Sequence, residues 1–424
     1  MFKLKKSHCA IIMLAASPSI ALAFNMWNRN NDNNNDGNGN TIEEPASADP
    51  VPTGPPNAEN QKPAFPEQTR APERVSQYTL KTETILDNLN YPWAIEFMPD
   101  GRLLMSQRSG TLSIVSQDGT QSSPILGLPE VADIGQGGLM DVLLSENFET
   151  DRMVYFSYAE PREASTNATA VARGTLNSAG SLLRNVEVLF HQEPPWDSSK
   201  HFGSRLAWGA DGMLYISTGE RSLPEPRELA QDLTKSLGKV IRIKPDGSAP
   251  SDNPFANNPR GLDEIWSYGH RNIQGIARHP VSNKIWTIEH GPKGGDELNV
   301  PEPGKNYGWP TITYGEDYTG VPIGNGITQK SGLEQPVYYW DPVIAPASMT
   351  FYDGTLFPEW RNNILIGSLN PGGIVRIMLD GEKVIGEERL EENLGRVRDV
   401  MVAPDGAIWA VTDRRNGKLV RISR

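Results

Sequence analysis

The chain has 424 residues, and its 52 acidic residues outnumber its 40 Lys and Arg residues, which gives a formal net charge of −12 at pH 7. Such an acidic chain is a poor nucleic-acid binder, and the sequence has no basic stripe with interleaved aromatic residues. It also has no CxxCH haem site, no P-loop and no GxGxxG between a strand and a helix, which argues against nucleotide and nicotinamide chemistry.

The first 23 residues have the pattern of a secretory signal peptide. Three lysines precede a mostly apolar run at residues 10–22, and Ala21-Leu22-Ala23 is a small-x-small cleavage site. The apolar run is too short for a membrane span. Cys9, the only cysteine, lies inside this segment, so we expect a mature protein without disulfides, thiol chemistry or a lipid anchor. The sequence therefore predicts export, either to the periplasm or out of the cell.

Residues 24–77 have little apolar surface to bury. The segment is rich in Asn at first and then in Pro and acidic residues. This composition is typical of a disordered linker. The remaining residues, 78–424, are enough for one large domain and leave little room for a second.

One pattern recurs six times along residues 78–424. Each copy has an apolar strand, a tight turn and a second strand rich in β-branched and aromatic residues, as in WAIEFMPDGRLLMS at residues 93–106. The other copies lie at residues 139–158, 205–218, 275–289, 349–368 and 400–412. Turn pairs such as Asp211-Gly212 tolerate the positive φ of a tight hairpin. Six hairpins at a spacing of roughly 45–75 residues predict an all-β fold, a six-bladed β-propeller with four-stranded antiparallel blades.

The two ends of this domain are expected to meet. The C-terminal strand at residues 418–423 would share a blade with the strand at residues 78–85, which closes the ring and leaves no sheet edge exposed. The alternative is a long all-β sandwich array, whose repeats would be shorter.

Polar and charged residues concentrate just before the hairpins. In a propeller the loops that enter the innermost strands gather at one mouth of the central channel, so these residues should lie together. The loops include DIGQGG, SKHFGSR, YGHRNIQG and GRVRD, and EHGPKGGDELN follows the fourth hairpin. They bring to one mouth His201, Arg271, Asn272, His290, Arg396 and Arg398, with Gln136 opposite.

Three arginines at one mouth of an acidic protein indicate an anionic ligand, because the guanidinium fork binds carboxylates bidentately. His201 is the natural general base, since His is the only side chain whose unperturbed pKa lies near neutrality. Taken singly, each Arg could form a surface or inter-blade salt bridge, and each His could be structural. Their equivalent positions in the repeats favour one shared functional site.

The GPKGGDELN stretch offers oxygen ligands. Gly291 and Pro292 form a bend whose carbonyls can face a hard cation, and Asp296 and Glu297 add carboxylates. Calcium takes about six to eight oxygens, backbone carbonyls included, so this loop is a candidate calcium site. The alternative is a glycine-rich turn with a solvated acidic pair.

Together, QGG, KHFGSRL, GHRNIQG, EHGPKGGDELN, NYGWP and RVRDV resemble the soluble PQQ-dependent sugar dehydrogenases (glucose/sorbosone dehydrogenase-like), in particular the aldose sugar dehydrogenase branch. The resemblance runs from about Leu86 to the C-terminus, with the motifs in the family's order. It implies a six-bladed propeller that holds pyrroloquinoline quinone (PQQ) with Ca²⁺ and oxidises the C1 hydroxyl of aldose sugars to lactones. Electrons would pass from the cofactor to an external acceptor.

The resemblance also implies roles for individual residues. His201 falls where the family has its catalytic base, and Gly291 and Pro292 fall where backbone carbonyls hold the catalytic calcium. Glu297 and Tyr307 fall on a further calcium site. Positions that contact or cover the cofactor correspond to Gln136, Arg271, Asn272, His290, Tyr318, Asn370, Arg396 and Arg398.

Two residues depart from the family pattern. Asn370 stands where the family usually has a Lys that touches the cofactor, and Lys200 precedes His201 where the glucose dehydrogenases have Asp. Loss of one cation weakens anion binding, unless Lys200 reaches the mouth and compensates. We therefore expect this chain to bind PQQ more weakly than a relative that has the Lys.

Two other functions are compatible with the same fold. A six-bladed calcium lactonase would hold its metal mainly with side-chain carboxylates and Asn, and would not need three arginines. A non-catalytic sugar- or protein-binding propeller, displayed on the Asn- and Pro-rich linker, would need no cofactor. The sequence does not name the sugar, the electron acceptor or the oligomeric state.

Overall fold

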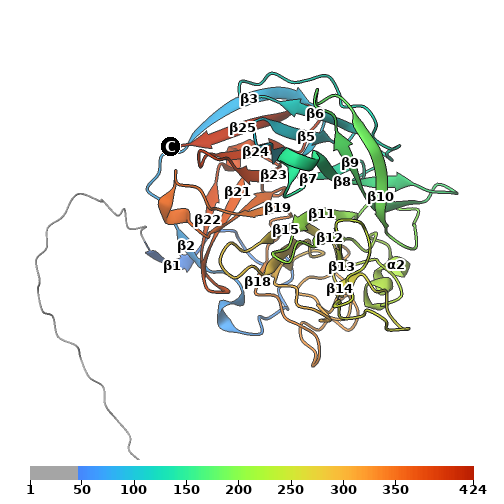
Figure 1. Ribbon diagram of the computed structural model, residues 1–424. Coiled ribbons are helices and arrows are strands. Elements are labelled where there is room, and N and C mark those ends of the chain that lie inside the picture. The colour runs from blue at the N-terminus through green and yellow to red at the C-terminus, as the bar shows by residue number, and fades with distance from the viewer. Residues whose placement is uncertain (1–45) are drawn as a thin grey trace, which may run out of the picture. The chain divides into compact units, whose positions relative to one another are not determined.

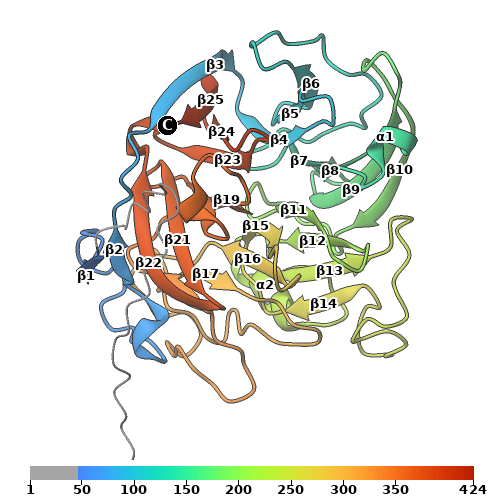
Figure 2. The same cartoon turned by 60° about the vertical axis from the view of Figure 1, so that its left-hand side comes forward.

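The computed structural model describes residues 46–424, so the predicted signal peptide, Cys9 and the Asn-rich part of the expected linker lie outside the described residues. Six sheets are arranged around a central axis (Figures 1 and 2), which confirms the predicted six-bladed β-propeller. In the described part of the chain, no helix is long and apolar enough to cross a membrane.

Each predicted hairpin forms the two innermost strands of one blade. In chain order the pairs are β4 (Pro92–Phe97) and β5 (Leu103–Gln107), β7 (Leu139–Leu144) and β8 (Met153–Pro161), β11 (Gly203–Trp208) and β12 (Leu214–Thr218), β15 (Ile273–Arg278) and β16 (Ile285–Glu289), β19 (Pro346–Phe351) and β20 (Ile364–Ser368), and β23 (Val397–Val402) and β24 (Ile408–Thr412). All six pairs are antiparallel. Most of these residues are buried, because neighbouring blades cover both faces of each sheet.

The outer strands complete the blades. They are β6 (Thr111–Val115), β9 (Asn167–Leu176) and β10 (Leu183–His191), β13 (Lys239–Ile243) and β14 (Ile265–Tyr268), β17 (Asp296–Asn299) and β18 (Tyr338–Trp340), β21 (Ile374–Asp380) and β22 (Lys383–Leu390), and β25 (Gly417–Ser423) with β3 (Lys81–Leu89). The first blade differs from the prediction, since in the described chain its sheet has three strands, β4, β5 and β6.

The last strand of the chain closes the ring. β25 pairs antiparallel with β3, with Val420 opposite Thr84 and Ile422 opposite Thr82. The expected meeting of the two ends is thereby confirmed, and Figure 2 shows β3 and β25 side by side near the C-terminus. This pairing removes the edge that each strand would otherwise expose.

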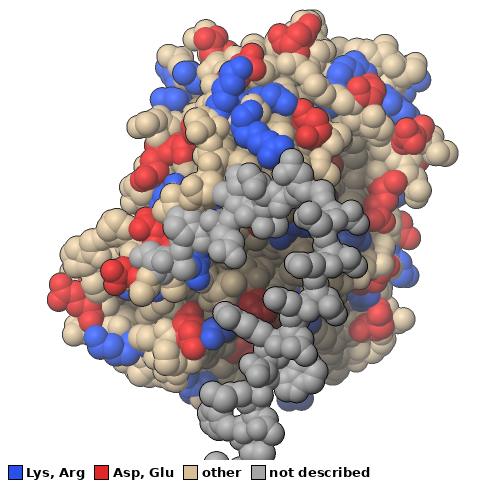
Figure 3. All heavy atoms as spheres, turned by 90° about the vertical axis from the view of Figure 1, so that its left-hand side faces the viewer, with Lys and Arg blue, Asp and Glu red and all other residues tan. Residues whose placement is uncertain are grey.

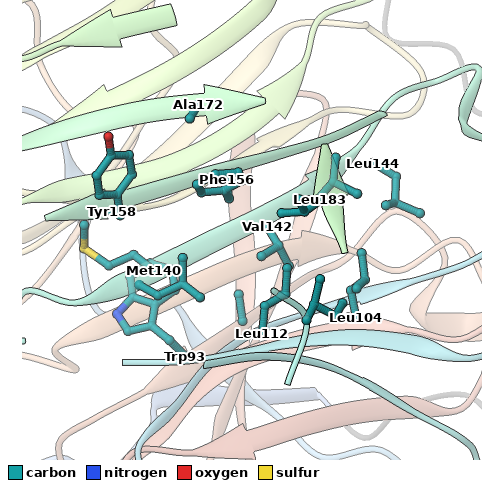
Figure 4. Close-up of a cluster of buried hydrophobic side chains, with 14 of the residues drawn as sticks. Trp93, Leu104, Leu112, Met140, Val142, Leu144, Phe156, Tyr158, Ala172 and Leu183 are labelled. Atoms are coloured by element: carbon teal, nitrogen blue, oxygen red, sulfur yellow. The ribbon is translucent and has the colours of Figure 1, made fainter. Parts of the chain in front are cut away.

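Apolar side chains fill the space between adjacent blades. Figure 4 shows one such cluster between the first two blades, where Trp93, Leu104, Met140 and Phe156 are all buried. Trp93 and Met140 also line the cavity described below, so the base of the candidate site is continuous with the core.

Helical segments are short and lie in the connections. They are α1 (Phe148–Asp151), α2 (Pro224–Glu228) and the 3₁₀ turns η2 (Leu229–Gln231), η3 (Pro358–Trp360) and η4 (Glu392–Leu394). Acidic and basic side chains are interspersed on the face shown in Figure 3.

Residues 46–77, which we call the N-terminal arm, correct the expectation of a disordered linker. The arm contains β1 (Ala46–Pro50), η1 (Pro66–Gln68) and β2 (Pro72–Arg74), and β2 extends the fifth blade by pairing with β22. Gln68 is fully buried, and Ala71 belongs to the core between the fourth and fifth blades. The arm has little apolar surface, so its composition suggested disorder. It is nevertheless attached, because hydrogen bonds hold it to the propeller.

Candidate active site

A cavity of about 230 Å³ lies at the end of the channel where the innermost strands begin. Its walls come from the loops that precede these strands and from residues that follow the second strands. The lining residues are Trp93, Arg108, Gln136, Met140, Phe202, Gly203, Asn272, Gln274, His290, Ala345, Leu369, Arg396, Arg398 and Asp413. The structure thus places Gln136, Asn272, His290, Arg396 and Arg398 of the predicted site around one cavity.

His201 lies buried beside this cavity, directly before the lining residue Phe202. Its Nδ1 is 2.8 Å from Oε1 of Glu220, which is buried as well. Burial and the charge of Arg271 lower the pKa of His201 to about 4. Burial alone would raise the pKa of Glu220, but the hydrogen bond from His201 lowers it. At neutral pH the imidazole is therefore neutral, donates its Nδ1–H to the carboxylate and keeps Nε2 as a proton acceptor.

The backbone around His201 is constrained. His201 has a φ of +51°, in the left-handed region that residues other than Gly rarely adopt. Its amide N–H donates to Oε1 of Gln136 at 2.9 Å. Gly219 lets the segment that carries Glu220 approach His201 closely, because a Cβ at Gly219 would lie 2.2 Å from the His201 carbonyl oxygen. Such conformations persist only when the surroundings hold them, and they cluster at functional sites.

Asp413 holds two arginines at the cavity. Nη2 of Arg396 and Nη2 of Arg398 donate to its Oδ2 at 2.6 and 2.9 Å. Burial would raise the pKa of Asp413, but the charge of Arg398 and the hydrogen bond from Arg396 lower it to about 2. Nη1 of Arg398 donates to Oε1 of Gln274 at 3.1 Å, while its Nε is buried without a hydrogen-bond partner among residues 46–424. An unpaired guanidinium donor at a cavity wall suits an anionic ligand.

Arg271 does not line the cavity but holds the loop that follows β16. Its Nη1 donates to the carbonyl oxygens of His290 and Gly291 at 3.0 and 2.6 Å. Its Nε is also buried and lacks a hydrogen-bond partner within the described chain. Nε2 of His290 donates to the Pro346 carbonyl at 2.6 Å. Burial and the charge of Arg271 lower the pKa of His290 to about 3, so this imidazole is neutral and has Nδ1 free to accept a hydrogen bond.

Asp296 has a different role from the one expected. Its carboxylate accepts three backbone N–H groups, from Gly291 at 2.8 Å, Ile344 at 2.8 Å and Ala345 at 2.7 Å. Burial raises its pKa to about 7. Asp296 therefore connects the Gly291 loop to the entrance of β19, and its oxygens are already engaged.

Glu297 and Tyr307, expected at a further calcium site, have separate partners. Oε2 of Glu297 accepts from Asn299 at 3.2 Å, and burial together with the charge of Glu289 raises the pKa of Glu297. The Tyr307 hydroxyl donates to the Val300 carbonyl at 2.5 Å. Across the described residues, His, Cys, Asp and Glu side chains form no group of three or more that could hold a metal ion.

Three residues singled out from the sequence lie away from the cavity. Tyr318, expected to cover the cofactor, is 73% exposed and does not line the cavity. Asn370 is exposed and lines a separate groove beside the N-terminal arm rather than this cavity. Lys200 is exposed and is not among the lining residues either. In the loop after β20, Leu369 rather than Asn370 forms the cavity wall.

Arg205 lies in the channel between this cavity and a second one of about 360 Å³ lined by later residues of the same strands. The guanidinium contacts the innermost strands of the other five blades. Its partners are the Trp93 ring, the carboxylates of Asp141 and Asp399, and the carbonyls of Gln274, Ala347 and Arg398. Arg205 therefore fills the channel and supports the base of the candidate site.

Several site residues were missed by the sequence analysis. Glu220, Arg108 and Asp413 each follow the second strand of a repeat. In an antiparallel hairpin the end of the second strand lies beside the start of the first, so these residues reach the same mouth. A search of both flanks of each hairpin would have found them.

The sequence and the fold were compared with those of known proteins. The family model described as glucose/sorbosone dehydrogenase matches residues 89–421. Aldose sugar dehydrogenase YliI of Escherichia coli (strain K12) is 39% identical over 348 residues, which cover 81% of this chain and 93% of the relative. A crystal structure of glucose dehydrogenase has a TM-score of 0.78 and 43% identity, covering 80% of this chain and 99% of that one. The PQQ-bound form of aldose sugar dehydrogenase from Streptomyces coelicolor has a TM-score of 0.67 and 29% identity, covering 81% of this chain and 98% of that one. The chain belongs to the glucose/sorbosone dehydrogenase family.

Proposed function

We propose that this protein oxidises aldose sugars at the C1 hydroxyl to lactones, with PQQ and Ca²⁺ as cofactors and an external electron acceptor. The observation that carries this proposal is the neutral His201, held by Glu220, beside a cavity with arginine walls. A general base next to an anion-binding cavity is what PQQ-dependent alcohol oxidation requires. Family membership supports the same conclusion.

The cavity walls fit an anionic quinone. PQQ carries three carboxyl groups, and the unpartnered Nε atoms of Arg398 and Arg271 are donors of matching chemistry. Arg396 is half exposed, with 52% of its side chain accessible, and lines the cavity while it pairs with Asp413. Gln136, Asn272 and His290 add neutral polar groups around the same cavity.

His201 is the proposed catalytic base. Its neutral imidazole accepts the sugar hydroxyl proton at Nε2, and Glu220 stabilises the imidazolium that forms through the Nδ1–H hydrogen bond. When bound, PQQ supplies the hydride acceptor, and calcium supplies the positive charge that polarises the quinone carbonyl. The low pKa of His201 means that Nε2 is available over the whole neutral range.

Gly291 and Pro292 are the proposed calcium ligands, through their carbonyl oxygens. In the structure the Gly291 carbonyl accepts from Arg271, so a cation there competes with this guanidinium. Carboxylates of a bound quinone would give Arg271 an alternative partner, which couples cation binding to anion binding. Glu297 and Tyr307 remain proposals for a further calcium site.

The signal-peptide pattern supports the proposal of an exported protein, periplasmic or secreted, that transfers electrons to an acceptor outside the cytoplasm.

The proposal is tested with the apoprotein by isothermal titration calorimetry and a dye-linked sugar oxidation assay. We expect PQQ to bind at micromolar concentration or below when Ca²⁺ is present, and more weakly when it is absent. Aldose oxidation should require both cofactors. If no PQQ binds in the presence of calcium, the dehydrogenase proposal is wrong, and lactone hydrolysis and sugar binding are the activities to measure next.

A further inference from the structure

The N-terminal arm lies before the segment that the glucose/sorbosone dehydrogenase family model matches. The family match begins at residue 89, and the glucose dehydrogenase structure is covered over 99% of its length by only 80% of this chain. The arm is nevertheless packed against the propeller, with β2 beside β22 (Figure 2). A segment outside the family match that is held by so many hydrogen bonds is expected to have a physical role.

The arm is attached to the residues between β18 and β19 by hydrogen bonds. The carboxylate of Asp341 accepts from the backbone N–H groups of Asn57 at 2.5 Å and Ala58 at 3.1 Å. Oδ1 of Asn57 accepts from the Val343 N–H at 3.1 Å. Nη2 of Arg70 donates to the Asp341 carbonyl at 2.7 Å. Both polar ends of Asp341 are thus held by the arm.

Three further hydrogen bonds extend this attachment to β18 and the residues before it. The buried Gln68 donates from Nε2 to the Pro336 carbonyl at 2.9 Å and accepts from the Tyr314 hydroxyl at 2.9 Å. The Ala71 N–H donates to the Tyr338 hydroxyl at 2.9 Å. Residues 336–343 therefore have the arm along one side.

The other side of the same segment carries the loop of the candidate site. The Gly295 N–H donates to the Trp340 carbonyl at 3.0 Å. Asp341 lies directly against Gly294, since a Cβ there would meet Oδ1 of Asp341 at 3.0 Å. Asp296 then joins the loop to Ile344 and Ala345, and His290 donates to the carbonyl of Pro346. Residues 336–346 lie between the arm and the loop at residues 290–296.

We propose that the N-terminal arm is a positioning element of the active site, which holds residues 336–346 in place and thereby fixes His290 and the Gly291 loop. Its Asn57 and Arg70 are the positioning residues. The role of that loop in cofactor binding rests on the proposed function, whereas the mechanical connection rests only on the contacts given above. Asp341 is buried, and its carboxylate accepts backbone N–H groups of the arm in place of water.

Hydrogen exchange of the full chain measures this connection without any ligand. The test compares wild type with the double variant Asn57→Ala/Arg70→Ala, and with Glu67→Ala as a matched control in the same arm. Glu67 pairs only with the exposed Lys383 and does not contact residues 336–346 in the structure. Amides of Gly291, Gly295, Ile344 and Ala345 should exchange about tenfold faster in the double variant, because each such hydrogen bond depends on the held segment. They should be unchanged in the control.

Two results would overturn the proposal. In one, the arm amides of Asn57 and Ala58 lose protection while the loop amides stay protected, so the loop does not depend on the arm. In the other, exchange accelerates uniformly across all blades, which indicates general stability alone. If the double variant does not fold, Asn57→Ala alone is measured in the same way, and Arg70→Lys should retain more protection than Arg70→Ala because it keeps a donor.

A second readout separates this proposal from the proposed function. Calcium affinity in the presence of PQQ should fall about tenfold in the double variant and remain unchanged in Glu67→Ala. Faster loop exchange in a protein that binds no PQQ at all would leave the positioning role in place and refute the dehydrogenase function. Unchanged loop exchange in an active dehydrogenase would refute the positioning role alone.

Discussion

Replacement of Glu220 by Gln tests the catalytic base through its partner. The Glu220 carboxylate is 2.8 Å from Nδ1 of His201, and its side chain is 1% exposed, so this hydrogen bond is shielded from water. A buried hydrogen bond to a charged group contributes about 1.5–3 kcal/mol. Because about 1.36 kcal/mol corresponds to tenfold in rate, the variant should oxidise sugar roughly 10- to 150-fold more slowly.

The same variant should shift the pH profile in a defined direction. The base must be deprotonated, so kcat/KM falls as pH drops through the pKa of His201, which is about 4 with the carboxylate in place. Glu220 raises that pKa, so its neutralisation moves the acid limb to lower pH. A loss caused by general unfolding would not move the limb in this way.

The assay is dye-linked aldose oxidation by the holoenzyme from about pH 3 to about pH 8. This range includes both the lowered and the ordinary pKa of a histidine. Glu225→Gln is the matched control, because it makes the same change on an exposed residue at the start of α2. Wild-type turnover with an unshifted acid limb in Glu220→Gln would refute the role of this pair.

Three further substitutions have defined outcomes. Arg398→Met should weaken PQQ binding by roughly tenfold or more in calorimetry, because it removes a desolvated charge-assisted hydrogen bond. Asp296→Asn should lower the free energy of unfolding by about 1–3 kcal/mol in a denaturant titration, since its amide cannot accept all three backbone N–H groups. Asn370→Ala should leave the PQQ dissociation constant unchanged, because Asn370 lines a different groove; a large change would place it in the site after all.

The fold was predictable because each repeated hairpin is determined by residues close together in the sequence. Turns such as Asp100-Gly101 and Asp405-Gly406 require positive φ, and both glycines have it, at +82° and +84°. The strands around them need only β-branched and aromatic residues, which are visible in the sequence. The N-terminal arm was not predictable, because Asn57, Gln68 and Arg70 form hydrogen bonds with residues 268 to 286 positions later in the chain.

The candidate site was predictable in part for the same reason. His201 lies just before β11 and Arg398 lies at the start of β23, so topology alone brings them to one mouth. Glu220 and Asp413 follow the second strands, a flank that the sequence analysis did not search, and their roles depend on partners that the pattern does not name. Asn370 lines a neighbouring groove while the preceding residue Leu369 forms the cavity wall, because a shift of one residue along a strand or loop exchanges wall and exterior.

Reduction of bound PQQ by an aldose in a single turnover tests the central claim most directly. Wild type and His201→Asn are each loaded with PQQ and calcium, mixed with an aldose and followed by stopped-flow absorbance. Both proteins should bind PQQ with similar affinity, and the variant should reduce it roughly 10²–10⁴-fold more slowly, the usual contribution of a general base. Reduction at the wild-type rate in His201→Asn, or no reduction in loaded wild type, would contradict the account.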